Sequence, residues 1–373
     1  MKAIAIVPGT AGARIVERPE PAVAAPDDVK LRVIRVGICG TDREELSGGR
    51  ADAPDGRKEL VIGHEMFGQV VEAGSAVTRV KVSDYAVFTV RRGCNACAPC
   101  RMGRSDMCQT GNYRERGIKG LDGYQTEFAV DGEQYVVRVP AELEAVGVLM
   151  EPLSIVEKAV DEALRVQAVR DPEAATTPDW LFGRRCLVAG LGPVGLLAAL
   201  VLRLRGGEVY GLDVVDAASA RPAWLGGIGG HYVDAREVPA DRVAKKIGWM
   251  DLVVDASGIP ALEFNLLDAL AVNGIYVVTG IPGASRPIEI PGAELVRQLV
   301  LDNQLMLGSV NAARGHFQMG ADDLEQAHLK WGAHLDELIT QHYTPEQFVA
   351  SVDPHEPDSI KQVVEWATAV KPA

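Results

Sequence analysis

The sequence predicts an α/β protein with two domains, the first rich in β-strands and the second built on a doubly wound parallel sheet. Three observations support this fold class. The chain has 373 residues, which exceeds what one ordinary core requires and suits two domains of about 100–200 residues each. Residues 1–140 contain short apolar runs separated by Gly, Asp and Ser. From residue 185 onward, apolar strands alternate with helical segments, which is typical of a parallel sheet covered on both faces.

The β-rich part begins with alternating apolar and charged residues over 29–36, which predict a half-buried strand. Similar runs predict further strands over 67–72, 85–90 and 126–130. Residues 143–169 have helical composition and an apolar face at helical spacing, so we expect a long helix there. Residues 170–179 are rich in Pro, Thr, Ala and acidic residues, and we expect them to form a loop.

The parallel-sheet part opens with a strand, a glycine-rich turn and a helix in direct succession. The predicted strand 185–189 leads into Gly190-Leu191-Gly192-Pro193-Val194-Gly195, and a helix over 196–204 follows. Gly190 allows a tight turn, Gly192 lets the backbone approach a pyrophosphate, and Gly195 permits close packing of helix on strand. The N-terminus of the helix offers free N–H groups and partial positive charge to phosphates. This order is typical of a Rossmann domain that binds a dinucleotide.

Asp213 ends the next predicted strand, 209–212, at a position where such domains place an acid. A carboxylate there can accept hydrogen bonds from both hydroxyls of the adenosine ribose, and it repels a 2′-phosphate. Val214 and Val215 offer no compensating arginine. We therefore expect NAD to be preferred, with NADP use left open. The alternative is that Asp213 is only a solvated acid at the end of a strand.

Four of the six cysteines lie within one short segment, in the spacing C-x2-C-x2-C-x7-C. They are Cys94, Cys97, Cys100 and Cys108. Four thiolates fill the tetrahedral shell of a zinc ion and leave no open position, so this segment predicts a structural zinc site. The alternative, four unrelated cysteines in a loop, fits the spacing poorly.

A second set of potential ligands is dispersed along the chain. Cys39 follows one predicted strand, His64 and Glu65 precede another, and Glu151 opens the long helix. Taken singly, each residue has an ordinary explanation, such as a small buried thiol or a core histidine. Together, a thiolate, an imidazole and a carboxylate with one open position would form a catalytic zinc site that polarises an alcohol.

Composition disfavours two classes of partner. The chain has 51 acidic and 38 basic residues and a formal charge of −13, so its surface should repel phosphate backbones and anionic lipids. We therefore expect no nucleic-acid partner. No apolar run reaches the roughly 20 residues that span a bilayer, and the N-terminal residues lack a signal sequence, so we expect no membrane association and a cytoplasmic location.

The motifs together resemble the zinc-dependent medium-chain dehydrogenase superfamily over nearly the whole chain. The shared features are GICGTD at 37–42, GHE at 63–65, the four-cysteine segment and GLGPVG at 190–195. Within that superfamily the chain is most similar to the glucose 1-dehydrogenases, through TVRRGC at 89–94 and the segments 113–118, 150–159 and 308–317. The resemblance implies a GroES-like catalytic domain over 1–155, to which 306–373 returns, and a Rossmann NAD-binding domain over 156–305.

The resemblance also implies roles for single residues. Cys39 and His64 would bind catalytic zinc, with Glu65 and Glu151 contributing directly, through water, or alternately during turnover. The residues implied near the sugar hydroxyls are Thr41, Glu115, Glu151 and Asn311, and those implied near the cofactor beyond the glycine-rich turn are Ser309 and Asn311. The sequence departs from many alcohol dehydrogenases at Glu44, where a proton-relay histidine is usual.

The expected activity is that of a zinc-dependent aldose 1-dehydrogenase, which oxidises the C1 hydroxyl of D-glucose to gluconolactone with NAD(P). Two zinc ions per chain and a homodimer or homotetramer are expected with it. One rival is a polyol (sorbitol) or threonine dehydrogenase, which has similar motifs. Another is a non-catalytic NAD-binding module, because a fold alone does not establish activity. A module with only the structural site would hold about one zinc ion per chain.

Overall fold

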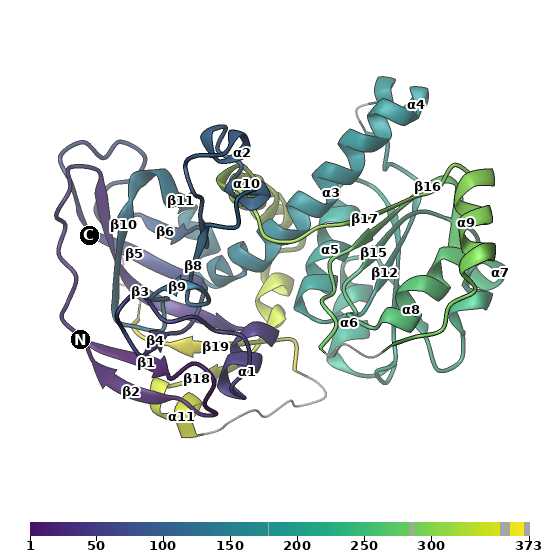
Figure 1. Ribbon diagram of the computed structural model, residues 1–373. Coiled ribbons are helices and arrows are strands. Elements are labelled where there is room, and N and C mark those ends of the chain that lie inside the picture. The colour runs from purple at the N-terminus through teal and green to yellow at the C-terminus, as the bar shows by residue number, and fades with distance from the viewer. Residues whose placement is uncertain (178, 284–286, 351–358, 369–373) are drawn as a thin grey trace. The chain divides into compact units, whose positions relative to one another are not determined.

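The computed structural model describes residues 1–177, 179–283, 287–350 and 359–368, which fold into two compact units (Figure 1). Unit 1 comprises Met1–Ser154 and Asn311–Ala373, and unit 2 comprises Ile155–Val310. The limit expected at residue 305 falls before the end of unit 2, because β17 (Leu305–Gly308) pairs with β16 (Leu270–Val278) in the sheet of unit 2. Parts of the expected C-terminal return, 351–358 and 369–373, lie outside the described residues.

Unit 1 is organised around a mainly antiparallel sheet in the order β11-β6-β5-β3-β19-β18, with β10 also paired to β3. The long strand β3 pairs with β5, β10 and β19, and most of its residues are buried. The strands are β3 (Asp28–Ile38), β5 (Glu65–Ala73), β6 (Tyr85–Phe88), β10 (Phe128–Gly132), β11 (Val136–Val139), β18 (Ile339–Tyr343) and β19 (Lys361–Glu365). The four strands expected within residues 1–140 all overlap members of this sheet, and β19 joins it from the C-terminal part of the chain.

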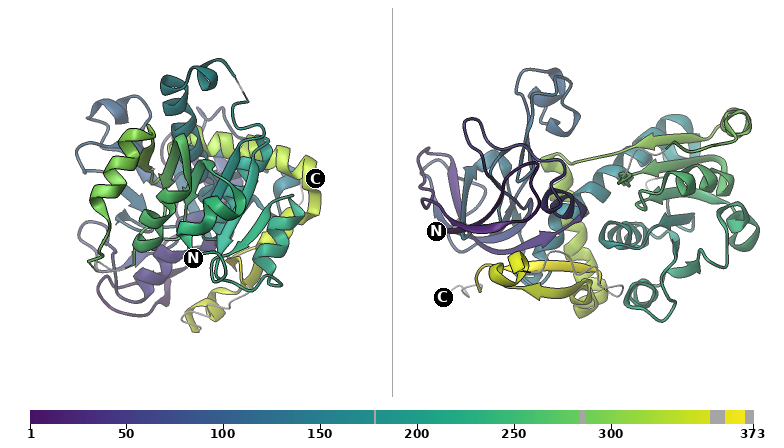
Figure 2. Two further views of the ribbon diagram at one scale, coloured as in Figure 1. Left: turned by 90° about the vertical axis from the view of Figure 1, so that its right-hand side faces the viewer. Right: turned by 60° about the horizontal axis from the view of Figure 1, so that its bottom comes forward.

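Two smaller sheets and four whole α-helices also lie in the part of unit 1 that the structure describes. One sheet has the order β2-β1-β4 and the other β7-β8-β9. Their strands are β1 (Lys2–Ile6), β2 (Arg14–Glu17), β4 (Leu60–Val61), β7 (Arg91–Arg92), β8 (Arg114–Arg116) and β9 (Gly120–Leu121). The helices are α1 (Gly40–Leu46), α2 (Ala98–Arg101), α10 (Arg314–Trp331) and α11 (Pro345–Ala350). The segment 93–113 between β7 and β8, hereafter the lobe, projects from these strands, in blue at the top of the right-hand view of Figure 2.

A buried ionic cluster lies beside the β7-β8-β9 sheet. Arg92 Nη2 donates to Asp131 Oδ2 at 2.5 Å, and Arg116 Nη2 donates to the same oxygen at 2.7 Å. The Arg92 guanidinium also stacks on Tyr135, 3.8 Å from the ring centroid. Burial disfavours the Asp131 carboxylate, but the two arginines outweigh burial and lower the pKa of Asp131. The cluster therefore consists of one carboxylate held between two guanidinium groups, and it lies beside the small sheet.

The long helix expected over 143–169 begins later than the sequence suggested. The residues 141–149 form two 3-10 turns, and α3 runs over Met150–Arg170. Gly147 lies so close to Phe67 that a Cβ atom would be 2.4 Å from its ring. The loop expected over 170–179 contains a short helix, α4 (Pro172–Thr176), because the Asp171 side chain caps it by accepting from Glu173 N at 2.9 Å.

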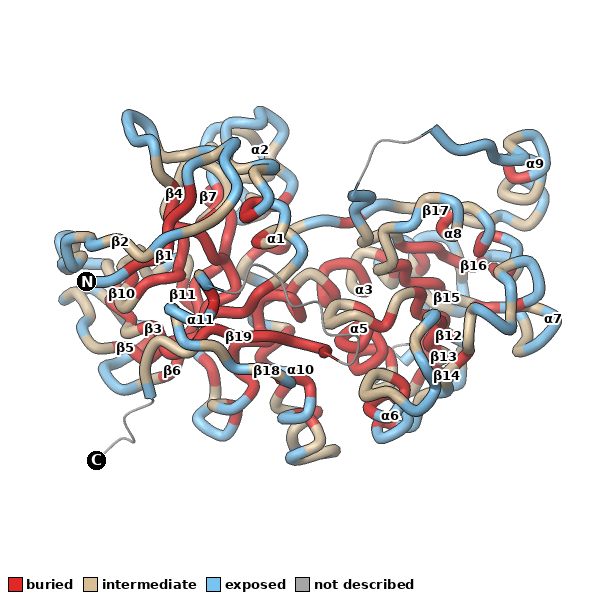
Figure 3. The backbone as a smooth tube through the Cα atoms, turned by 90° about the horizontal axis from the view of Figure 1, so that it is seen from below, coloured by how far each residue is buried: buried red, intermediate tan, exposed pale blue. Residues whose placement is uncertain are grey.

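Unit 2 is a six-stranded parallel sheet in the order β14-β13-β12-β15-β16-β17, which confirms the doubly wound class. Besides β16 and β17, its strands are β12 (Arg185–Ala189), β13 (Glu208–Asp213), β14 (His231–Asp234) and β15 (Met250–Asp255). Its further helices are α5 (Pro193–Leu204), α6 (Ala220–Gly227), α7 (Val243–Ile247), α8 (Pro260–Asn265) and α9 (Gly292–Leu301). Figure 3 shows buried segments, in red, along the inner strands, where the apolar runs read from the sequence lie.

None of the helices in the described ranges combines the length and the apolar composition that crossing a bilayer requires.

Candidate active site

Three potential zinc ligands meet at one end of β3 and β5 in unit 1. Cys39 directly follows β3 and caps the N-terminus of α1, and His64 directly precedes β5. The antiparallel register places Glu65 opposite Gly37, two residues before Cys39. The side-chain ligand atoms of Cys39, His64 and Glu65 all lie within 4.8 Å of one another, and Cys39 Sγ is 3.2 Å from His64 Nε2. The strand register thus brings together residues far apart in the sequence.

Each of these ligands contacts a second polar group. Lys361, which is 1% exposed, forms an ion pair with Glu65 and donates from Nζ to the Ile38 carbonyl at 3.1 Å. Asp42 accepts from Cys39 N at 2.8 Å through Oδ2, and its Oδ1 lies 3.9 Å from His64 Nδ1. At 3.9 Å the Asp42 carboxylate interacts with the imidazole by charge and not by a hydrogen bond.

The electrostatics of this cluster suit a bound cation. Burial raises the pKa of the Cys39 thiol. Burial also disfavours the charged form of His64, but the neighbouring Cys39 and Asp42 raise its pKa well above the usual value. A buried thiol, an imidazole and carboxylates so close together are matched by a divalent cation, which stabilises the thiolate and the carboxylates. The donor set of sulfur, nitrogen and oxygen is the one that zinc accepts.

Glu151 is the fourth predicted member of this site and lies in the first turn of α3. It is buried but falls outside the group of three ligand atoms within 4.8 Å. Burial raises the pKa of Glu151 to about 7, while the charge of His64 lowers it and the charge of Glu65 raises it further. Two carboxylates are therefore candidates for the site: Glu65, which lies with Cys39 and His64, and Glu151, which lies outside that group of ligand atoms.

The predicted sugar-binding residues lie in unit 1 as well, and two of them contact each other. Asn311 Nδ2 donates to Glu115 Oε1 at 2.7 Å, although 196 positions separate the two residues. Thr41 N donates to Cys39 Sγ at 3.2 Å, which places Thr41 beside the candidate zinc ligands. The Thr41 hydroxyl has no hydrogen bond to another described residue.

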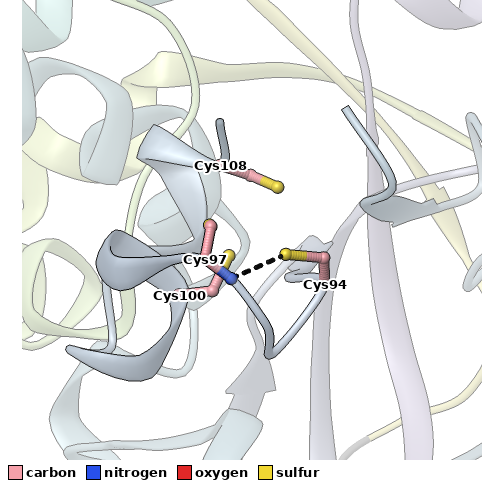
Figure 4. Close-up of side chains that lie close together, drawn as sticks. All are labelled: Cys94, Cys97, Cys100 and Cys108. Atoms are coloured by element: carbon pink, nitrogen blue, oxygen red, sulfur yellow. Dashed lines mark hydrogen bonds between the residues drawn. The ribbon is translucent and has the colours of Figure 1, made fainter. Parts of the chain in front are cut away.

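The four cysteines of the lobe form a second candidate metal site (Figure 4). Their sulfur atoms all lie within 4.8 Å of one another. The backbone N–H groups of Cys97 and Ala96 donate to Cys94 Sγ at 3.4 Å each. Hydrogen bonds from Thr110 and from these amides lower the pKa of Cys94 to about 5, whereas burial raises the pKa of Cys100 to about 12. Four such sulfurs can all ionise only around a cation, so the set fits a closed zinc shell.

The glycine-rich turn in unit 2 has the geometry that a dinucleotide site needs. Gly190 has a backbone φ of 83°, and a Cβ on Gly195 would lie 1.8 Å from the Gly190 carbonyl oxygen. By contrast, a Cβ on Gly192 would have no heavy atom within 4 Å, and Gly192 is the N-cap of α5. The helix thus packs tightly on the strand, while its N-terminal backbone stays open to an approaching phosphate.

Asp213 lies at the end of β13, beside this turn. Its Oδ2 accepts from Leu191 N and its Oδ1 from Val214 N, each at 2.6 Å. Each carboxylate oxygen keeps a further lone pair for a ribose hydroxyl. Arg221 Nη1 lies 4.0 Å from Asp213 Oδ2, so an arginine does stand near this acid, from α6 rather than from the residues directly after Asp213.

Ser309 follows β17 at the carboxyl end of the parallel sheet, the edge at which Gly190 and Asp213 also lie. Ser309 N donates to the Val278 carbonyl at 2.9 Å. Its hydroxyl is buried and has no partner among the described residues. An orphaned hydroxyl at this edge is consistent with a ligand that hydrogen-bonds to it.

Sequence reasoning missed four residues that belong to these sites. Asp42 stood inside the GICGTD motif and could have been noticed as a partner for a ligand histidine. Arg91, whose guanidinium donates to Glu115 Oε1, stood inside TVRRGC, but nothing in that motif tells which carboxylate it contacts. Lys361 and Arg221 carry no local signal, because each reaches its site through the topology of a sheet or helix.

Comparisons with known proteins agree with these motifs. Residues 25–141 match the alcohol dehydrogenase GroES-like domain, and residues 144–366, more than half of the chain, match the glucose dehydrogenase C-terminus. Glucose 1-dehydrogenase from Methanocella arvoryzae is 37% identical over 91% of this chain and 93% of that protein. Glucose 1-dehydrogenase 1 from Caldivirga maquilingensis is 37% identical over 98% of this chain and 99% of that protein.

A solved structure extends the likeness to three dimensions. It is that of Haloferax mediterranei glucose dehydrogenase in complex with NADP, Zn and gluconolactone. It has a TM-score of 0.87 and 31% identity, and the alignment covers 99% of this chain and 100% of that one. The family suggested by the motifs is confirmed, and the chain belongs to the glucose 1-dehydrogenase family of zinc-dependent medium-chain dehydrogenases.

Proposed function

We propose that the protein oxidises the C1 hydroxyl of an aldose, with D-glucose the foremost substrate, to the corresponding lactone, and that NAD accepts the hydride. The observation that carries this proposal is the meeting of Cys39, His64 and Glu65 at one end of two strands. The hydrogen-bonded pair of Glu115 and Asn311 in the same unit supports a polyhydroxylated substrate. A sugar needs several polar side chains, and such a site disfavours analogues that lack a hydroxyl because its polar groups would be left unpaired.

Cys39 and His64 would hold a catalytic zinc ion, with Glu65 or Glu151 as the carboxylate. When bound, zinc supplies a Lewis acid that lowers the pKa of an alcohol. Lys361 neutralises Glu65, and the Asp42 carboxylate lies 3.9 Å from the second ring nitrogen of His64, where it favours a positive charge on the imidazole. The free Thr41 hydroxyl beside Cys39 can accept the proton that leaves C1–OH and pass it to a carboxylate.

The second zinc ion would be held by the four lobe cysteines, which gives two ions per chain. Metal analysis of the purified protein tests this number directly. About two zinc ions per chain are expected, and about one would indicate that only the lobe is occupied.

The cofactor proposal rests on Asp213. Its carboxylate disfavours a 2′-phosphate, so we propose that NAD is the better cofactor. Arg221 lies close enough to Asp213 to offset part of that repulsion. We therefore propose that NADP is also accepted, but with a lower affinity than NAD. A homodimer or homotetramer remains a proposal, which light scattering of the purified protein can test.

The decisive experiment mixes the protein with aldoses, polyols and threonine, each with NAD and with NADP, and follows the absorbance of the reduced nicotinamide. Glucose with NAD is expected to give the highest kcat/KM. Oxidation of sorbitol or threonine without any aldose turnover would reject the sugar assignment and retain the dehydrogenase class. Cys39→Ser should remove the activity, and Cys186→Ala, which deletes a thiol in β12 far from any candidate ligand in the sequence, is the matched control.

A further inference from the structure

The strongest unassigned feature of unit 1 is the side chain of Arg91, which contacts both the lobe and the predicted sugar-binding carboxylate. Arg91 lies in β7 and is only 8% exposed. Its Nε and Nη2 donate to Glu115 Oε1 at 3.0 and 2.9 Å, and its Nη1 donates to the Asp106 carbonyl at 3.0 Å. Asp106 lies in the lobe, two residues before Cys108. One guanidinium therefore joins the lobe to Glu115.

Several contacts hold this guanidinium in place. The Arg91 guanidinium stacks on the Tyr113 ring, 3.9 Å from its centroid, and Lys119 Nζ lies 4.2 Å from the same centroid. Arg91 and Glu115 are direct cross-strand partners in the β7–β8 pairing. A planar fork with fixed donors orients a carboxylate more tightly than a lysine ammonium can.

The contacts at Glu115 leave one oxygen for a ligand. Glu115 Oε1 accepts hydrogen bonds from Arg91 and from Asn311 Nδ2. Among the described residues, none donates to Glu115 Oε2. The saturated oxygen fixes the carboxylate, and the other oxygen can accept a hydrogen bond from a hydroxyl group.

The lobe connects β7, which carries Arg91, to β8, which carries Glu115. Arg91 stands three residues before Cys94, and β8 begins six residues after Cys108, so the two ends of the lobe lead directly into β7 and β8. Gly93 packs against the four-cysteine cluster so closely that a Cβ there would lie 2.7 Å from Cys100 Sγ. An ordered lobe therefore determines where Arg91 stands, and Arg91 determines where Glu115 points.

We propose that Arg91 is a positioning residue that couples the four-cysteine lobe to Glu115 and thereby sets the affinity for the sugar. This inference rests on the proposed function, because it takes Glu115 to be a ligand of the aldose. It assigns the lobe a second task besides stability, namely the orientation of a substrate-binding carboxylate.

Arg91→Lys keeps the positive charge but removes the planar guanidinium whose Nε and Nη2 both donate to Glu115. Arg92→Lys is a matched control. Arg92 is also buried and ion-paired, but it donates its hydrogen bonds to Thr89, Tyr124 and Asp131 rather than to Glu115. Both variants should lose stability. Only Arg91→Lys should raise the KM for glucose, by about 10- to 100-fold, with kcat and the Kd for NAD within about twofold of wild type.

Two readouts separate positioning from general damage. Glu115→Gln should raise the KM for glucose, and adding Arg91→Lys to it should change the KM by less than about twofold, because Arg91 acts through Glu115. Glucose should also raise the Tm of the zinc-loaded enzyme without NAD. The glucose concentration that gives half of this rise should be higher for Arg91→Lys than for wild type, by about the same factor as the KM.

The outcomes are distinct. If wild type oxidises no aldose, the proposed function and this inference fail together. If wild type oxidises glucose and Arg91→Lys keeps the wild-type KM, or if its effect adds in full to that of Glu115→Gln, only the inference is overturned. If Arg91→Lys does not fold, Tyr113→Leu decides, since loss of the stack should raise KM by about two- to fivefold and an unchanged KM overturns the coupling.

Discussion

Gly195 and Gly192 of the dinucleotide turn should respond to alanine in different ways, the first by losing stability and the second by losing affinity for the cofactor. A Cβ on Gly195 would lie 1.8 Å from the Gly190 carbonyl oxygen, whereas ordinary contact begins near 3.4 Å, so helix α5 and the turn must separate by about 1.6 Å. The Gly190 oxygen is a backbone atom and the backbone fixes the position of the Cβ, so neither can rotate away. We therefore expect a cost near the upper end of the usual overpacking range, about 3 kcal/mol. Helix propensity favours alanine by about 1 kcal/mol, which leaves a net loss of about 2 kcal/mol.

That loss corresponds to a fall in Tm of about 4–8 °C for a unit of this size. Gly192→Ala is the matched substitution, because its Cβ would have no atom within 4 Å and its φ of −66° suits alanine. We expect Gly192→Ala to cost less than about 1 kcal/mol of stability. It should instead raise the Kd for NAD by about tenfold or more, since the methyl group stands where a pyrophosphate approaches.

The assay is thermal melting without nucleotide, together with calorimetric titration of NAD, for wild type and both variants. A Gly195→Ala protein that melts with wild type would show that α5 does not pack on the turn as described. A Gly192→Ala protein with wild-type affinity for NAD would show that the phosphates bind elsewhere.

Other residues allow three shorter tests. Cys39→Ser should lose about one of two zinc ions and nearly all turnover, whereas Cys97→Ser should chiefly lower Tm; superimposable melting curves for wild type and Cys97→Ser would count against a structural site. Asp213→Ser should raise the ratio of kcat/KM with NADP to that with NAD by about tenfold or more, and an unchanged ratio would remove the argument for NAD preference. Asp131→Asn should destabilise the protein at pH 7, because Arg92 and Arg116 hold the pKa of Asp131 below its ordinary 3.8. Because the pKa of Asp131 is lower in the folded protein, its carboxylate stabilises the fold at pH values above 3.8, and this stabilisation is lost as the pH falls through the folded pKa. The difference in stability between wild type and Asp131→Asn should therefore shrink in acid, and a difference that stays constant across pH would refute the pairing.

The sequence predicted the elements of unit 2 more fully than the contacts of unit 1. The glycine-rich turn is a local pattern in which strand, loop and helix are consecutive, so spacing alone predicts its geometry. The four lobe cysteines are equally local. Both sets of residues lie together in the structure as the spacing suggested.

The dispersed site could be predicted only in part. Cys39 and His64 were recognisable from short motifs, but their partners depend on strand register, which no motif encodes. Lys361 reaches Glu65 because β19 lies beside β3, and Asn311 reaches Glu115 from a chain segment far away in sequence. The contact between Arg91 and Glu115 depends on which way each side chain points from a very short strand, and hydrophobic patterning does not predict this.

The position of β19 has a consequence for biosynthesis. This strand pairs with β3 on one side and β18 on the other, so the central sheet of unit 1 is incomplete until the ribosome has made residues 361–365. During most of translation β3 would present an unpaired edge, and Glu65 would lack its cationic partner. Because long-range pairing of this kind forms slowly, the edge of β3 is open to aggregation until β19 has been made.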